Sequence, residues 1–254
     1  MIKNLQIGKA SIIETGNTFG NMNTSRLFYP EECTPEERAR IFLERRMMAG
    51  RAFGFDGHKM FMADQKDKSG TWFEITDEYV DEHPNGWSDI DQDILIITDK
   101  TPGVVIGHPV ADCPVVMAFD RKKGVTAIAH CSADLVDRRM PMLLIDALLD
   151  SHRSSEEDII TYVSACAGSS WTYDRYPGWA QDDDIWGRHI VLGEDGLFHI
   201  DLKSAVVEQL RSRGVSDIIL SKVDTITDSN FYSNSEARKN VKKKGRNFAG
   251  TFYR

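Results

Sequence analysis

The sequence has few cysteines, no long apolar run and a deficit of positive charge. Its 254 residues contain four cysteines, and their irregular spacing is unlike a disulfide framework, so we expect free thiols or metal ligands. The longest nearly uncharged stretch, residues 101–119, is interrupted by three prolines, His108 and Asp112. It cannot form a spanning helix of about 20 apolar residues, and we therefore predict no membrane segment.

The charge balance and the N-terminus bear on partners and location. The chain has 31 Lys and Arg against 39 Asp and Glu, a formal net charge of −8. Such a surface repels nucleic acid and anionic lipid, so we expect neither as a partner. The first residues carry no apolar run and no small-residue cleavage site, which predicts a cytoplasmic protein.

The organisation of the chain predicts a single domain over residues 1–254, because no repeat and no Gly/Ser-rich or Pro-rich linker divides it. Thr34, Pro35 and two glutamates predict a helix that ends before Gly50. Helices are also expected over 140–152 and 202–213. Strands are expected over 70–75, 94–98, 103–106, 114–119, 125–129, 159–163 and 217–220. This interleaving indicates an α/β or mixed α+β fold, and residues 76–92 an exposed, lid-like loop.

The sequence predicts that Cys113 and His130 lie close together in space. Two strand-like runs flank a short charged turn that ends in Gly124, a pattern typical of a β-hairpin. Antiparallel pairing would place Cys113 opposite His130, with Cβ atoms about 4.5–5.5 Å apart. A thiolate and an imidazole at this separation can share a divalent ion, and the mixed donor set suits Zn²⁺ better than Mg²⁺ or Ca²⁺. Alternatively, Cys113 is a small buried hydrophobe and His130 a core histidine.

Several motifs together resemble the laccase-domain family. They are Asp99-Lys100-Thr101-Pro102-Gly103-Val104, Val110-Ala111-Asp112-Cys113-Pro114-Val115, Ala127-Ile128-Ala129-His130, Phe198-His199-Ile200-Asp201-Leu202 and Gly245-Arg246. The resemblance implies a laccase-domain-like fold, with mixed sheets flanked by helices, and a metal held by His, Cys and His. It also implies zinc-dependent phosphorolysis of purine nucleosides or methylthioadenosine, or deamination of adenosine. Copper-dependent phenol oxidation is a weaker alternative, because the chain lacks the many histidines of a multicopper site.

The chain departs from the family's metal-ligand pattern. Asp67 stands where the family has its first metal-binding histidine, and aspartate can also ligate zinc. The resemblance therefore implies Asp67, Cys113 and His130 as metal ligands, with His58 competing for the first position. If the metal site is lost, the chain is a non-catalytic nucleoside-binding or partner-binding homologue that kept the scaffold.

A second departure concerns phosphate. Asp134 stands where the family has an arginine after its second histidine, and a carboxylate there disfavours a bound phosphate. Arg138 and Arg139 are possible substitutes for the missing charge. Arg246 keeps the family pattern, and the resemblance implies that it binds substrate.

The remaining candidates are cysteines and aromatics. We expect Cys131 to point to the face opposite His130, and Cys166 to be buried. The aromatic cluster is a candidate platform for a planar base, or else part of the core. Its members are Trp171, Tyr173, Tyr176, Trp179 and Trp186.

Overall fold

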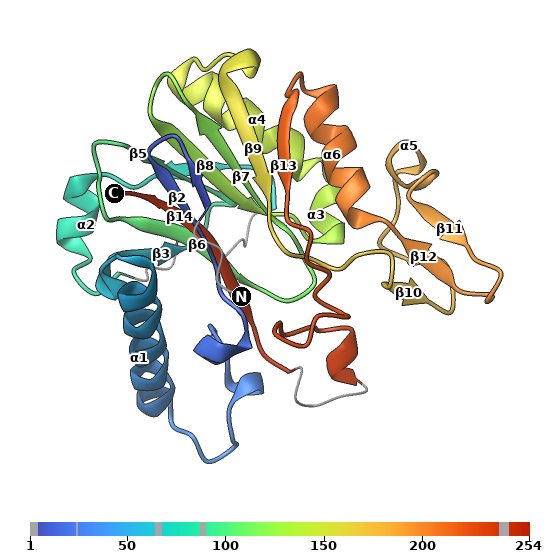
Figure 1. Ribbon diagram of the computed structural model, residues 1–254, viewed down its shortest axis with the longest axis horizontal. Coiled ribbons are helices and arrows are strands. Elements are labelled where there is room, and N and C mark those ends of the chain that lie inside the picture. The colour runs from blue at the N-terminus through green and yellow to red at the C-terminus, as the bar shows by residue number, and fades with distance from the viewer. Residues whose placement is uncertain (1–4, 24, 64–67, 87–89, 239–243) are drawn as a thin grey trace.

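The chain folds into layers whose two inner members are β-sheets (Figure 1). The structure, a computed structural model, describes residues 5–23, 25–63, 68–86, 90–238 and 244–254. Its strands are β1 (Leu5–Ile7), β2 (Ala10–Glu14), β3 (Met60–Met62), β4 (Trp72–Glu74), β5 (Ile94–Thr98), β6 (Val105–Val110), β7 (Val115–Asp120), β8 (Val125–His130), β9 (Ile159–Val163), β10 (Thr172–Tyr173), β11 (Ile190–Leu192), β12 (Phe198–Ile200), β13 (Asp217–Leu220) and β14 (Asn247–Tyr253). Its helices are α1 (Pro35–Phe53), α2 (Asp77–Glu82), α3 (Ala133–Asp137), α4 (Met140–His152), α5 (Asp183–Trp186) and α6 (Leu202–Ser212).

The two inner sheets are both mixed. One has the strand order β1-β2-β14-β6-β3 and the other β13-β9-β7-β8-β5-β4. In each sheet most neighbours are antiparallel, while β3 with β6, β4 with β5 and β9 with β13 are parallel. Helix α1 covers the outer face of the five-stranded sheet, and α3, α4 and α6 cover the outer face of the six-stranded sheet. The predicted mixed α/β class with flanking helices is confirmed.

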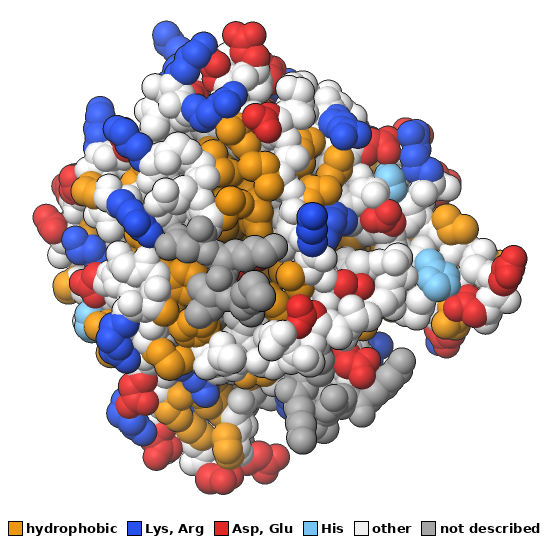
Figure 2. All heavy atoms as spheres, in the orientation of Figure 1, with side chains coloured by type: hydrophobic (Ala, Val, Ile, Leu, Met, Phe, Trp, Pro, Cys, Tyr) orange, Lys and Arg blue, Asp and Glu red, His pale blue; other side chains and the backbone are white. Residues whose placement is uncertain are grey.

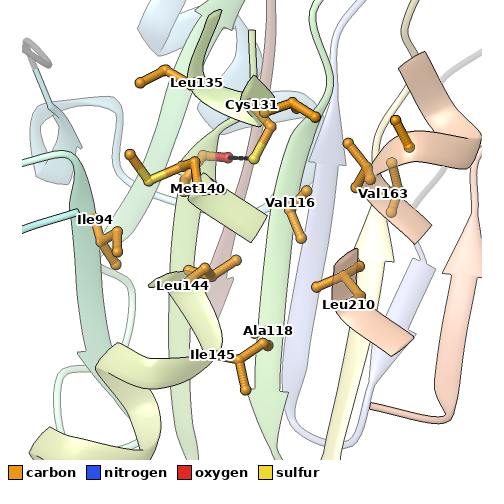
Figure 3. Packing of buried hydrophobic residues seen from close by; sticks show 14 of the residues in the cluster. Ile94, Val116, Ala118, Cys131, Leu135, Met140, Leu144, Ile145, Val163 and Leu210 are labelled. Carbon is orange, nitrogen blue, oxygen red and sulfur yellow. Dashed lines mark hydrogen bonds between the residues drawn. The ribbon is translucent and has the colours of Figure 1, made fainter. Parts of the chain in front are cut away.

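Side-chain alternation along the strands gives each sheet two buried faces. The inter-sheet core lies between the two sheets and includes Ile106, Val115, Met117 and Ile128. The helix-side core lies between the six-stranded sheet and its helices (Figure 3), and includes Val116, Ala118, Leu144 and Leu210. Neighbouring positions of one strand thus enter different cores, as the two-residue period of a strand requires.

The turn of the β7–β8 hairpin sets the pairing of the two strands, and the second strand ends at His130. The turn comprises residues 121–124, and Asp120 Oδ1 accepts hydrogen bonds from the Lys122 and Lys123 amides at 2.9 and 3.0 Å. Gly124 has a φ of 64°, in the left-handed region that favours glycine. A Cβ there would also lie 2.6 Å from the Asp99 carboxyl carbon.

Local sequence signals predicted several elements correctly. Helix α1 begins after Thr34, whose side chain forms a capping box with Glu37, but it continues past Gly50 and ends at Gly54, which has a φ of 86°. The prediction that residues 76–92 form a loop is wrong for its first part. Thr76 caps α2, and Val80 of this helix is buried against the inter-sheet core.

A small arm extends from the layered body. It is formed by the sheet β10-β12-β11 and the short helix α5 (Figure 1).

On the face shown in Figure 2, charged side chains of both signs surround a central group of hydrophobic side chains. None of the described helices is both long enough and apolar enough to cross a membrane.

Candidate functional site

Two histidines from different sheets approach each other in the layer between the sheets. His108 lies on β6 and is 2% exposed, and His130 is the last residue of β8 and is partly buried. Their ring centroids are 6.0 Å apart, with an angle of 34° between the ring planes. Both side chains share the face of Ile106 and Ile128, which belong to the inter-sheet core. We call His108 and His130 the histidine pair.

The environment keeps both imidazoles neutral. Burial lowers the pKa of His108 to about 3, and the neighbouring His130 contributes to the same shift. Burial also lowers the pKa of His130 to about 4, with smaller contributions from the positive charges of Arg246 and Lys68. A neutral imidazole has a free lone pair, which is the form that binds a metal ion. The histidine pair is therefore in its ligand form at neutral pH.

The predicted hairpin is present, but the predicted pairing of Cys113 with His130 is wrong by two residues. Val115 lies opposite His130, and the Cys131 amide donates to Pro114 O at 2.8 Å. The centre of the turn is one residue further along the chain than the sequence suggested, because the turn includes Gly124 and pairs Asp120 with Val125. Cys113 is thus a diagonal neighbour of His130, a relation that separates residues by about 7–8 Å.

Asp112 fixes the backbone at Cys113. It has a φ of 75°, a conformation that aspartate tolerates better than most residues. Its Oδ1 accepts a hydrogen bond from Thr225 Oγ1 at 2.8 Å, and its Oδ2 accepts one from the Ser235 amide at 2.6 Å. The Ala167 amide donates to its carbonyl at 2.7 Å. Asp112 therefore joins the start of β7 to the C-terminal segment and acts as a positioning residue.

The thiol of Cys113 lies in a protonated state without a cation. Burial and, to a smaller extent, the Asp112 carboxylate raise its pKa to about 12, while the charge of Arg246 acts to lower it. A metal ion deprotonates a thiol that coordinates it. The thiol therefore depends on a nearby positive charge to act as a ligand.

Arg246 provides positive charge close to both candidate ligands. Its charge lowers the pKa values of both Cys113 and His130. The guanidinium carbon lies 4.6 Å from the centre of the Phe28 ring, and the Arg246 amide donates to Asn21 Oδ1 at 3.0 Å. Segments near both ends of the chain thus hold this arginine, which the family resemblance implied as substrate-binding.

The carboxylate of Asp134 does not stand alone near the site. Lys68 Nζ donates to Asp134 Oδ2 at 2.9 Å, and Arg138 Nε lies 3.6 Å from Oδ1. Arg139 instead pairs with Asp182 at 2.9 Å. Lys68 also contributes positive charge at His130. The repulsion that Asp134 was expected to exert on a phosphate is therefore offset by Lys68, which sequence reasoning missed.

Part of the aromatic cluster lines a cavity of about 220 Å³ that also includes Cys113. Trp171 and Tyr173 come from the arm and form one wall of this cavity, and Asp112 and Ser235 contribute polar groups. Trp179 stacks on Trp171 from outside the cavity lining, with ring centroids 5.7 Å apart, and packs against Trp186 at 4.9 Å. Two of the five aromatics thus have access to a planar ligand, while Trp186 serves the core.

Two further cysteines, Cys131 and Cys166, are structural. Cys131 is fully buried in the helix-side core, where its Sγ lies 3.8 Å from Ala129 O (Figure 3). Cys166 is also fully buried, and burial raises its pKa to about 12. Both placements confirm the expectations from sequence.

Asp67 and His58 were the two candidates for the remaining metal ligand. Asp67 lies outside the described residues. His58 lies before β3, whose register places Met60 beside Val105 and Met62 beside Gly107. Because β6 continues from Gly107 to His108, the histidine pair is at the opposite end of β3 from His58. The structure does not bring His58 to the pair.

The described ranges hold no group of three His, Cys, Asp or Glu side chains that could hold a metal ion. Two imidazoles that bind one tetrahedral Zn²⁺ at about 2.0–2.1 Å have ring centres about 5 Å apart, whereas those of the histidine pair are 6.0 Å apart. Sequence reasoning missed His108, although the alternation Ile106-His108-Val110 places it on an apolar strand face.

Three solved structures are similar to this chain. The hypothetical protein YfiH of Bacillus licheniformis has a TM-score of 0.75 at 18% identity, covering 96% of this chain and 93% of its own. YlmD from Geobacillus stearothermophilus has a TM-score of 0.74 at 16% identity, covering 96% and 91%. A Neisseria meningitidis protein has a TM-score of 0.71 at 14% identity, covering 100% and 98%. These similarities confirm the predicted laccase-domain-like fold.

A sequence comparison gives the family. A search of curated proteins returned no match. The model of the family described as multi-copper polyphenol oxidoreductase laccase matches residues 34–253, which is most of the chain and includes His108, Cys113, His130 and Arg246. The resemblance seen in the motifs is confirmed, and the chain belongs to the multi-copper polyphenol oxidoreductase laccase family.

Proposed function

We propose that this protein is a metal-dependent enzyme that acts on purine nucleosides. One observation carries the proposal: the neutral histidine pair and the aromatic-lined cavity meet around one positive charge. Arg246 influences both His130 of the pair and Cys113 of the cavity. Arg246 is thus close to both proposed metal ligands, and one of them, Cys113, lines the cavity together with Trp171 and Tyr173.

Zinc is the metal that this donor set favours. Imidazole nitrogen and thiolate sulfur form the mixed set that Zn²⁺ prefers in proteins. Cys113 and His130 are proposed as ligands, and Asp67 stays a ligand predicted from the sequence. Bound Zn²⁺ would supply a Lewis acid at the floor of the cavity.

The residues around the cavity would position the nucleoside. The planar faces of Trp171 and Tyr173 can stack on a purine, since aromatic pairs prefer offset or edge-on contact with ring centres about 4.5–7 Å apart. Arg246 can hold an anionic group by charge-assisted hydrogen bonds, and a guanidinium is suited to phosphate. Asp112 would keep Cys113 in place through its bonds to Thr225 and Ser235.

Two reactions are compatible with this arrangement. In deamination, water replaces the amine of adenosine and ammonia leaves. In phosphorolysis, phosphate attacks the anomeric carbon of the ribose and the free base leaves. Because Lys68 pairs with Asp134, the local charge does not oppose phosphate. We therefore propose phosphorolysis of adenosine, inosine and methylthioadenosine alongside deamination of adenosine.

Product analysis tests the proposal. The zinc-loaded protein is incubated with each nucleoside, with and without phosphate, and ammonia and free base are quantified. We expect one of the two products, and a fall in kcat/KM of at least about 100-fold in His130→Ala, the size typical of losing a group that stabilises the transition state. The matched control is His199→Ala, whose histidine pairs with Asp195 on the arm.

The outcome separates the proposed enzyme from the alternatives. Turnover that His130→Ala abolishes and His199→Ala retains supports the proposal. Nucleoside binding without either product contradicts it in favour of a binding protein. Oxidation of a phenol by the copper-loaded protein, with no nucleoside turnover, contradicts it in favour of an oxidase.

A further inference from the structure

Strand β11 forms an open edge of the small arm. The arm sheet has the order β10-β12-β11, so β11 has a neighbouring strand on one side only (Figure 1). Two adjacent side chains of this strand are apolar and exposed, Val191 at 58% and Leu192 at 59%. The strand contains neither proline nor lysine, the residues with which proteins commonly protect such an edge. An unprotected apolar edge tends to pair with a further strand.

The ladder with β12 shows which backbone groups of β11 are available for pairing. The His189 carbonyl and the Gly193 amide each form a 2.8 Å hydrogen bond to a residue that flanks β12. Because hydrogen-bonded pairs alternate along antiparallel strands, the odd-numbered residues of β11 bond to β12. The N–H and C=O groups of Ile190 and Leu192 therefore point away from β12, and no residue in the described ranges pairs with them.

We propose that β11 pairs with β11 of a second copy of this chain, antiparallel and about a two-fold axis at Val191. In this register Ile190 of each copy lies opposite Leu192 of the other, and the two residues exchange both backbone hydrogen bonds. The two arm sheets then form one continuous sheet. Both copies use the same surface, so the contact closes at a dimer. The inference is independent of the proposed function.

The charges beside β11 favour this register. Arg188 precedes Val191 by three residues and Glu194 follows it by three. A two-fold axis at Val191 therefore places the arginine of each copy opposite the glutamate of the other, and opposite charges across antiparallel strands stabilise their pairing. An axis at Ile190 or at Leu192 would also let the outward backbone groups pair. Either of these would set Arg188 or Glu194 opposite an apolar side chain.

The arginine is available for this contact, although the dimer should be weak. The Arg188 side chain is 69% exposed, with its Nη1 3.2 Å from Glu208, and a guanidinium has further N–H groups to donate. A three-residue edge buries much less than the ~1,600 Å² of a standard interface, so we expect a dissociation constant of about 10–100 µM.

Sedimentation equilibrium over a concentration series that brackets this value measures the dissociation constant. Val191→Lys should weaken the dimer at least about 10-fold, because it sets two like charges opposite each other at the two-fold axis. The matched control is Leu27→Lys, which places the same charge at an apolar side chain that is 73% exposed and lies outside the arm. It should leave the dissociation constant unchanged.

Reversing one charge at a time tests the register itself. Arg188→Glu alone and Glu194→Arg alone should each weaken the dimer about 10-fold, because each replaces two attractive pairs by two repulsive ones. A mixture of the two variants should recover the affinity of the unaltered protein. In the mixed dimer, both glutamates of one copy face arginines of the other. Recovery on mixing also shows that both variants are folded.

Each outcome decides the inference without reference to turnover. A dimer that Val191→Lys weakens, Leu27→Lys keeps and the mixture of charge variants restores supports it. A protein that stays monomeric throughout the series overturns it. A dimer that Val191→Lys leaves unchanged, or charge variants that fail to recover when mixed, overturns it as well.

Discussion

The two faces of the six-stranded sheet are built from the same strands but bury different chemistry. The helix-side core is formed by apolar side chains, and of the residues considered for function it buries Cys131 and Trp186. The inter-sheet face holds Thr126, hydrogen-bonded to Tyr253 Oη at 2.7 Å, and further along β8 the histidine pair. One residue step along β8 separates the two environments, because Ala127 and Ala129 face the helices. The helix-side face serves packing, while the inter-sheet face also carries polar groups that need partners.

The largest expected effect comes from the face that only packs. Leu144 of α4 is fully buried in the helix-side core, so Leu144→Ala should lower the free energy of unfolding by about 2–5 kcal/mol through lost burial and the cavity left behind. Urea denaturation measures this loss, and Leu27→Ala, at a side chain that is 73% exposed, is the control. The loss should be the same with and without zinc. A loss that depends on zinc would mean that the two faces are not independent.

A smaller effect is expected where the inter-sheet face satisfies its polar groups. Tyr253→Phe leaves the buried hydroxyl of Thr126 without its partner, and should lower the free energy of unfolding by about 1–3 kcal/mol. Adding Thr126→Val removes both polar groups and should recover most of that loss. A double-mutant cycle by urea denaturation measures the coupling. Additive losses in the double variant would show that this hydrogen bond is unimportant.

At the histidine pair the comparison predicts a gain in the free energy of unfolding instead of a loss. With the metal removed by a chelator, His108→Leu replaces a buried nitrogen that has no hydrogen-bond partner among the described residues by an apolar group, and should raise the free energy of unfolding by about 1 kcal/mol. Thermal unfolding in the presence of the chelator measures the change. A metal-free variant clearly less stable than the unaltered protein would assign His108 a packing role.

The smallest change in stability is expected for the exposed ion pair between Lys68 and Asp134. The hydrogen bond from Lys68 holds the pKa of Asp134 below its usual value of 3.8. Because the folded pKa is depressed, the stabilisation is present above pH 3.8 and disappears as the pH falls through the folded pKa. Asp134→Asn should therefore lose less than about 1 kcal/mol at pH 7, since both side chains are partly exposed, and nothing in strong acid. Thermal unfolding across this pH range would reveal a loss that persists in acid, contrary to the expectation.

Local chemistry made part of this fold predictable from the sequence. The N-terminal cap at Thr34 and the β-branched runs at 94–98 and 159–163 correspond to α1, β5 and β9. Helix α4 has the predicted bounds, Met140–His152. These signals are local, because capping and burial on both faces are determined by neighbouring residues. The strands near the two termini were missed, since β2 and β14 pair across almost the whole chain.

The candidate site was less predictable because it depends on register and on contacts between sheets. A shift of one residue at the centre of the β7–β8 turn moved Cys113 out of alignment with His130. His108 was missed because the strand was expected to end at Ile106, whereas β6 continues through Pro109 to Val110. Lys68 meets Asp134 only after folding. The expected single domain and the ligand role of Asp67 stay predictions.

Diffraction from a zinc-loaded crystal, recorded on both sides of the zinc absorption edge, tests the central claim most directly. The account predicts one anomalous peak about 2.0–2.1 Å from an imidazole nitrogen of His130 and about 2.3 Å from the Cys113 sulfur. A peak bound elsewhere, or one that leaves His130 outside ligand distance, would contradict it.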